Sequence, residues 1–139
     1  MPDDLDRFLI AQEGVYDGAL DELRGGRKSG HWMWFIFPQI AGLGRSTMSQ
    51  RYAIGSLDEA HAYLAHPVLG ARLRECAEAV LSVRGRSAEE ILGPIDAVKL
   101  RSSMTLFHRA APEDPVFREV IDRYYGRRLD DATDALLGA

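Results

Sequence analysis

Signals that start helices recur along this sequence, and they constrain its fold more than any other feature. Two serines, Ser56 and Ser87, are each followed three residues later by a glutamate, which is the pattern of a capping box. Proline suits the first turn of a helix because its missing N–H has no partner there. Three prolines stand where they can open helices in this way: Pro67, Pro94 and Pro115.

Apolar residues near the start of the chain recur every three or four positions from Leu5 to Leu23, as on one face of a helix. Gly14 and Gly18 are places where this helix can divide, and the glycine pair at 25 and 26 can end it. We therefore predict a mainly α fold, a compact bundle of about six or seven helices. Their expected ranges are 4–24, 57–65, 67–83, 88–92, 94–109, 115–125 and 130–137.

Sequence typical of a strand is scarce. The one candidate lies near residues 31–38, where the run from Trp32 to Phe37 is aromatic and is ended by Pro38. We expect this segment to be irregular or briefly extended. A chain of 139 residues without repeats or linkers fits one globular domain over residues 1–139.

The sequence shows no sign of export, membrane insertion or a metal centre. Its first residues are acidic where a secretory signal is basic, and no apolar run approaches the roughly 20 residues needed to cross a bilayer. The single cysteine, Cys76, can form neither an internal disulfide nor a multi-cysteine zinc site. We therefore expect a cytoplasmic protein with no membrane contact, no metal and no cofactor.

The chemically distinctive stretch runs from Arg24 to about Tyr52. Although the net charge of the chain is −4, five of its 17 cations and none of its 21 acids lie between Glu22 and Asp58. Both tryptophans lie in the aromatic run inside this stretch. Such a segment can hold an anion with its cations and stack a planar ligand on its rings. The same aromatic density also suits a buried cluster on which helices pack, and both interpretations stay open.

The loop after the aromatic run contains two glycines followed by an arginine and a serine, which allow the backbone to approach an anionic oxygen closely. It matches neither a P-loop nor a dinucleotide-binding fingerprint. The residues that we expect to contact a ligand in this half of the chain are Lys28, Trp32, Trp34, Gln39, Gly42, Gly44, Arg45 and Ser46.

A second candidate wall lies on the helix that begins at Pro94. At 100° per residue, Asp96, Lys99 and Ser103 form a narrow polar stripe with apolar residues on both sides. Buried polar groups need partners or a ligand. Asp96 and Lys99 can pair with each other, or Asp96 can face the cationic segment; Lys99 and Ser103 are further candidate ligand contacts.

His31 and Asp96 are the candidate catalytic residues. A histidine can exchange protons near neutral pH, and a carboxylate can act on a substrate or hold a cation in place. The cationic segment has no carboxylate of its own, so an acid in a site built there must come from outside it.

Several blocks of the sequence resemble the family called "domain of unknown function 1810": residues 26–39, 42–46, 52–54, 63–73 and 96–107. The resemblance covers nearly the whole chain and implies a compact, mainly helical, bacterial-type protein of unestablished activity, with no catalytic residues to carry over. The chain is also similar to the NAD- and ADP-ribose-associated superfamily in size, helical character and order of its aromatic and lysine-containing segments. That similarity implies adenine nucleotide derivatives as ligands.

These observations favour a protein that binds or processes a small phosphorylated ligand, such as a nucleotide or an ADP-ribose-like compound, in a pocket lined by residues 28–49. A nucleic-acid or protein interaction module without catalysis is an alternative, and the negative net charge disfavours nucleic acid. A purely structural role is the third hypothesis. The sequence leaves open whether the protein is an enzyme and whether it forms oligomers.

Overall fold

Helices dominate residues 4–138, the part of the chain that the computed structural model describes. The fold is compact and mainly helical, as predicted, and this range contains no strand, only one isolated bridge. The expected number of six or seven helices is wrong, since ten occur here. They are α1 (Asp6–Gln12), α2 (Tyr16–Arg24), α3 (Met33–Ile36), α4 (Thr47–Arg51), α5 (Leu57–Ala65), α6 (Leu69–Ser82), α7 (Ala88–Leu92), α8 (Pro94–Ala110), α9 (Pro115–Tyr124) and α10 (Asp131–Leu137).

Two local features account for the larger number of helices. The first predicted helix divides at Gly14, which has a φ of +72° and separates α1 from α2, whereas Gly18 stays inside α2. The short helices α3 and α4 form within the segment that has no acids. Helices of about one turn are not stable alone and depend on packing, so periodicity and capping signals do not reveal them.

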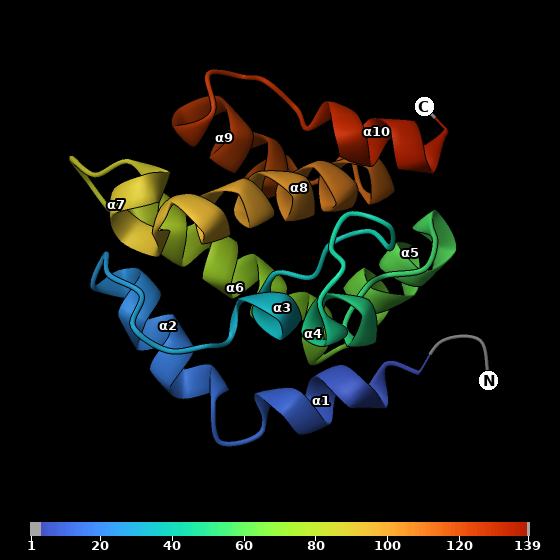
Figure 1. Cartoon of the computed structure of the whole chain (residues 1–139). Helices are drawn as coiled ribbons and strands as arrows, with labels where there is room; N and C mark the ends of the chain where they lie inside the picture. The colour runs from blue at the N-terminus through green and yellow to red at the C-terminus, as the bar shows by residue number, and fades with distance from the viewer. Residues whose placement is uncertain (1–3, 139) are drawn as a thin grey trace.

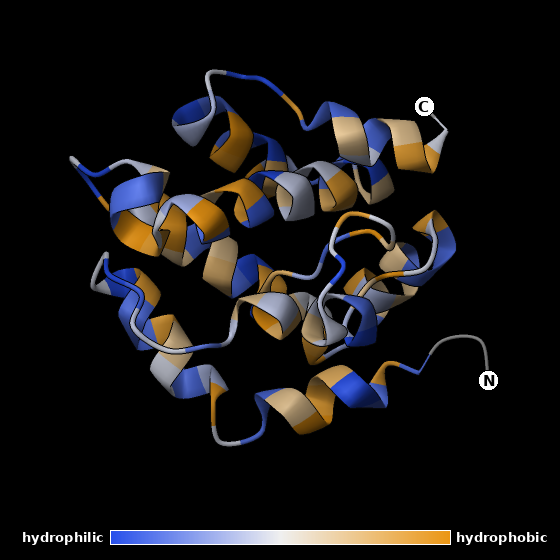
Figure 2. Ribbon diagram, in the orientation of Figure 1, coloured by the Kyte–Doolittle hydropathy of each residue, from blue (hydrophilic) through white to orange (hydrophobic). Residues whose placement is uncertain are grey.

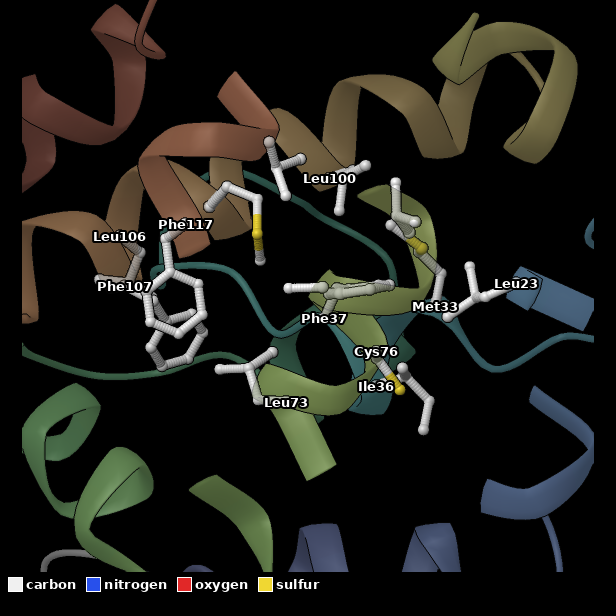
Figure 3. Packing of buried hydrophobic residues seen from close by; sticks show 14 of the residues in the cluster. Leu23, Met33, Ile36, Phe37, Leu73, Cys76, Leu100, Leu106, Phe107 and Phe117 are labelled. Atoms are coloured by element: carbon white, nitrogen blue, oxygen red, sulfur yellow. The ribbon is translucent and has the colours of Figure 1, made fainter. Parts of the chain in front are cut away.

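The aromatic segment near residues 31–38 contains the helical turn α3 in place of the irregular or extended path that we predicted. Figure 3 shows the ring of Phe37 in the middle of the core, with Leu100 on one side and Cys76 on the other. A strand would send alternate side chains to opposite faces, whereas this turn buries nearly all of them. Its side chains with less than a tenth of their surface exposed are Trp32, Met33, Phe35, Ile36 and Phe37.

Serines and prolines start the later helices as predicted, with one shift. Ser56 and Ser87 each accept a hydrogen bond from the backbone N–H three residues ahead, but the full capping box forms at Ser87 and not at Ser56, because Glu59 accepts from the N–H of Gly55 instead. Two of the three prolines open α8 and α9. The helix expected from Pro67 begins two residues later, at Leu69. There the imidazole Nδ1 of His66 accepts hydrogen bonds from two first-turn amides, at 3.1 and 3.2 Å.

Helix α8 is central to the arrangement and packs against α5, α7, α9 and α10. Figure 1 shows it crossing the molecule, with α9 and α10 on one side and the segment that contains α3 and α4 on the other. Polar and apolar residues mix along the ribbons in Figure 2, as expected for amphipathic helices around a core. Among the described residues, no helix has the length and apolar character needed to span a bilayer.

Candidate functional site

The loop that precedes the aromatic turn is held in place by Glu22, at the end of α2. Its Oε1 accepts hydrogen bonds from the backbone N–H groups of Ser29 (2.8 Å) and Gly30 (2.9 Å) and from the indole Nε1 of Trp32 (2.9 Å). Burial raises the pKa of Glu22, but these bonds outweigh burial and lower the pKa to about 2. Glu22 was not among the predicted site residues, although it is the last acid before the cationic segment.

Glu22 gives the protein a pH dependence that one substitution can isolate. Because its pKa is about 2 in the folded protein and 4.5 as an ordinary glutamate, its ionisation stabilises the fold above about pH 4.5, and this contribution is lost as the pH falls toward 2. We expect the free energy of unfolding to fall between pH 6 and pH 3 by about 1–2 kcal/mol less in Glu22→Gln than in wild type; the difference is no larger because solvent reaches part of the carboxylate. Urea unfolding of both proteins at the two pH values measures this difference. Equal losses in wild type and variant would contradict this role.

Two lysines share the carboxylate of Asp96 where the loop meets α8. Lys28 Nζ lies 2.9 Å from Oδ2 of Asp96, and Lys99 Nζ lies 3.4 Å from Oδ1. The three side chains expose only 10%, 20% and 18% of their surface for Lys28, Lys99 and Asp96. Both interpretations of Asp96 are therefore confirmed: it pairs with Lys99 and it also faces the cationic segment. Two ammonium groups on one carboxylate leave the cluster with a net charge of +1.

The two tryptophans of the aromatic run have different environments. Trp32 is 2% exposed, and its ring lies beneath Lys28, with 5.1 Å between Nζ and the ring centroid. Trp34 is only partly buried, and Lys99 Nζ lies 4.9 Å from its centroid. The indole Nε1 of Trp34 is itself buried and has no hydrogen-bond partner among the described residues. Trp32 thus belongs to the core, whereas Trp34 is less buried and has a buried indole donor that no described residue uses.

Two cavities adjoin at the start of α8, where both contact Pro94 and Ile95. The first, here called the lysine cavity, has a volume of about 320 Å³ and is lined by Lys28, His31, Trp34 and Asp96 together with the residues around the start of α8. The second, here called the apolar cavity, has a volume of about 480 Å³. Its apolar lining consists of Leu43, Pro94, Ile95, Val98 and Ala132, and its polar lining of Gln39, Gly44, Ser49, Lys99, Ser102 and Asp130.

The structure brings seven of the twelve candidate site residues to these cavities. The other five line neither cavity. Arg45 and Ser46 are exposed, and the Ser46 side chain caps α4. Ser103 is fully buried on α8, with an Oγ that has no partner among the described residues. The seven are Lys28, His31, Trp34, Gln39, Gly44, Asp96 and Lys99; the five are Trp32, Gly42, Arg45, Ser46 and Ser103.

The two glycines of the 42–44 loop serve packing. Gly42 has a φ of +103°, and a Cβ there would lie 3.2 Å from the side chain of Leu136 on α10. A Cβ on Gly44 would overlap the side chain of Ser49. The close approach that the sequence suggested for an anion is therefore used by the chain's own side chains, and Gly44 reaches the apolar cavity only as part of its wall.

The cluster is better suited to holding a ligand than to a defined reaction. His31 is exposed at the lysine cavity, and no described residue forms a hydrogen bond with its ring. No hydroxyl or thiol lies in the lysine cavity's lining, so a nucleophile of the serine, threonine or cysteine type is absent from this lining. Among the described residues, no group of three or more histidine, cysteine or acidic side chains is placed to hold a metal ion.

Comparison with known proteins gives a family and a relative of the same fold. Residues 2–137 match the family described as "Protein of unknown function (DUF1810)". The crystal structure of the conserved hypothetical protein Rv1873 from Mycobacterium tuberculosis is 54% identical in sequence and superposes with a TM-score of 0.97. The match covers 100% of this chain and 99% of that one. A search of curated proteins found no match.

Proposed function

Since the chain belongs to the DUF1810 family, whose description names no activity, we propose a function from the site itself: the protein binds a small phosphorylated ligand in the groove between residues 28–49 and the start of α8. The single observation that supports this most is the pair of lysines on one carboxylate. Lys28 and Lys99 lie beside open cavities and are partly shielded from solvent, so their excess positive charge acts on a ligand with less screening than an exposed cation would.

Backbone and indole donors add to the attraction for an anion. Helix α8 has 17 residues, begins at a glycine N-cap, and has no side chain that caps its first amides. The positive end of the helix dipole and these N–H groups favour an anion at the point where the two cavities meet. Trp34 lines the lysine cavity, and its buried Nε1 has no partner among the described residues. Such a donor costs about 1–3 kcal/mol, which a ligand oxygen that reached it would recover.

A panel of paired compounds tests the proposal. Pyrophosphate, ADP and glucose 6-phosphate are compared with adenosine and glucose by isothermal titration calorimetry on the full chain. We expect binding of the phosphorylated members only, and we expect Lys28→Ala or Lys99→Ala to weaken it about tenfold or more, because a charge-assisted hydrogen bond contributes about 1.5–3 kcal/mol.

Arg45→Ala is the matched control for the lysine variants. It removes one positive charge as they do, and Arg45 lies in the same segment as Lys28, but Arg45 is exposed and lines neither cavity. Its affinity for the phosphorylated compounds should stay within about twofold of wild type. Absence of binding at millimolar concentrations, or equal losses in all three variants, would contradict a site at the lysine pair.

Titrations with a single-stranded oligonucleotide at low and high salt, beside those with the small phosphates, separate this proposal from a nucleic-acid interface. Most rings of the aromatic run are buried in the core and cannot stack bases, and among the tryptophans only Trp34 retains exposed ring surface. A nucleic-acid module would bind single strands with an affinity that falls steeply with salt and would leave the small phosphates unbound. That outcome would favour the alternative over a small-molecule site.

A further inference from the structure

Two exposed apolar side chains stand one turn apart on α8 beside the lysine pair. Ile95 is 74% exposed and Val98 is 63% exposed, and both line the apolar cavity. Isolated exposed apolar residues are common, but adjacent ones that line a cavity with Leu43 and Ala132 form a surface that binding can remove from water. Lys99 lines the same cavity, but a phosphate held by the lysine pair would leave the apolar side chains of Ile95 and Val98 uncovered.

The polar groups in the lining of the apolar cavity have unused hydrogen-bonding capacity. Asp130 accepts bonds through Oδ2 from Ser102 Oγ (2.9 Å) and from Thr133 N (3.1 Å) and Oγ1 (2.5 Å), whereas its Oδ1 accepts none from the described residues. The side-chain amide of Gln39 also has no partner in this range. Besides Lys99 and the hydroxyls of Ser49 and Ser102, the cavity therefore combines aliphatic surface with a carboxylate oxygen that can accept and an amide that can both donate and accept.

We propose that the apolar cavity holds a flat heterocycle carrying an amino group, such as an aminopurine or aminopyrimidine base, while the phosphate of the same ligand lies at Lys28 and Lys99. This inference rests on the proposed function and specifies its ligand. A flat ring packs on aliphatic side chains with both faces and presents its hydrogen-bonding groups only at its edge, which matches a lining of this kind. The amino group donates to Oδ1 of Asp130.

Other phosphorylated compounds fit this half of the groove less well. A sugar has hydroxyl groups around its whole ring, and each would lose its water against aliphatic side chains without a replacement partner. An alkyl chain would cover Ile95 and Val98 but would leave the carboxylate of Asp130 and the amide of Gln39 without partners. Both compounds serve as comparison ligands in the test.

The test measures the affinities of ADP, IDP, ribose 5-phosphate, hexyl phosphate and pyrophosphate by calorimetry. We expect ADP to bind at least tenfold more tightly than ribose 5-phosphate, hexyl phosphate and pyrophosphate, and several-fold more tightly than IDP, which has a carbonyl in place of the amino group. Val98→Asn, which replaces apolar surface without adding charge, should abolish the advantage of ADP and leave pyrophosphate binding within about twofold. Ile10→Asn is the matched control, because Ile10 is 71% exposed on α1 and lines neither cavity.

Asp130→Asn tests the edge contact separately. An asparagine can still accept the bonds from Ser102 and Thr133 through its oxygen, while its amino group replaces Oδ1 with a donor. We expect this variant to lose the preference for ADP over IDP. Thermal unfolding checks that α10, which Asp130 caps, remains folded.

Failure of this inference and failure of the proposed function give different results. Equal affinities for all of the phosphorylated compounds, together with a Val98→Asn variant that behaves like wild type, would overturn the inference and leave phosphate binding at the lysines intact. Pyrophosphate and ADP affinities that do not respond to Lys28→Ala or Lys99→Ala would overturn both. Tighter binding of hexyl phosphate than of ADP would overturn the inference and indicate that the apolar cavity holds an aliphatic group, not a heterocycle.

Discussion

Trp32→Ala is expected to destabilise the protein by about 3–5 kcal/mol, a large part of the roughly 5–15 kcal/mol that holds a domain together. Trp32 is among the largest fully buried side chains, so truncation leaves a cavity in the core. The substitution also removes the hydrogen bond to Glu22 and the ring beneath Lys28. Urea unfolding at neutral pH measures the loss.

Trp34→Ala is the matched comparison, because the two tryptophans are two residues apart. Trp34 is only partly buried and its Nε1 has no partner in the described chain, so truncation removes less apolar contact and no hydrogen bond. We expect a cost of about 1–2 kcal/mol. Equal destabilisation by the two substitutions would show that Trp34 is a core residue and would remove it from the site.

Gly70→Ala is expected to destabilise the protein by about 3 kcal/mol, although alanine favours a helix over glycine by about 1 kcal/mol. Gly70 lies in the first turn of α6, and a Cβ there would overlap the backbone carbonyl of Leu64 in α5. A backbone carbonyl cannot rotate away as a side chain can. The two helices would have to separate, and the contact between α5 and α6 would be lost.

Gly18→Ala is the control for that substitution. Gly18 lies inside α2, and a Cβ there would have nothing within 4 Å. We expect it to stabilise the protein by up to about 1 kcal/mol, because alanine loses less conformational freedom in a helix. Thermal melts of the two variants should therefore move in opposite directions. A stable Gly70→Ala variant would mean that α5 and α6 are not packed this closely.

The later helices could be predicted because residues close to each helix start determine where it begins. A serine with a glutamate three residues later supplies acceptors for the first amides of a helix, and a proline in the first turn has no N–H that needs a partner. Neither signal depends on distant residues. The short helices α3 and α4 could not be predicted in this way, since one turn gains too few hydrogen bonds to form alone. The aromatic residues around α3 are helical because the surrounding helices bury them.

The candidate site was predictable on α8 and less so in the loop. The helical period placed Asp96 and Lys99 together, and charge alone indicated that a carboxylate would meet the cationic segment. Which cation it meets depends on how the chain folds back, and it is Lys28 rather than Arg45. Sequence could not separate Trp32 from Trp34 either, because their burial depends on the tilt of a single helical turn.

The most direct measurement of the central claim is an NMR titration of the two indole N–H signals with pyrophosphate and ADP. Trp34 lines the lysine cavity, and its buried Nε1 has no hydrogen-bond partner among the described residues, whereas Trp32 Nε1 donates a hydrogen bond to Glu22. We expect a saturable shift of the Trp34 signal, a smaller shift of the Trp32 signal, and a titration midpoint at about tenfold or more higher ligand concentration in Lys28→Ala. A Trp34 signal that stays unchanged at millimolar ligand, or that has the same midpoint in Lys28→Ala, would contradict a phosphate site at the lysine pair.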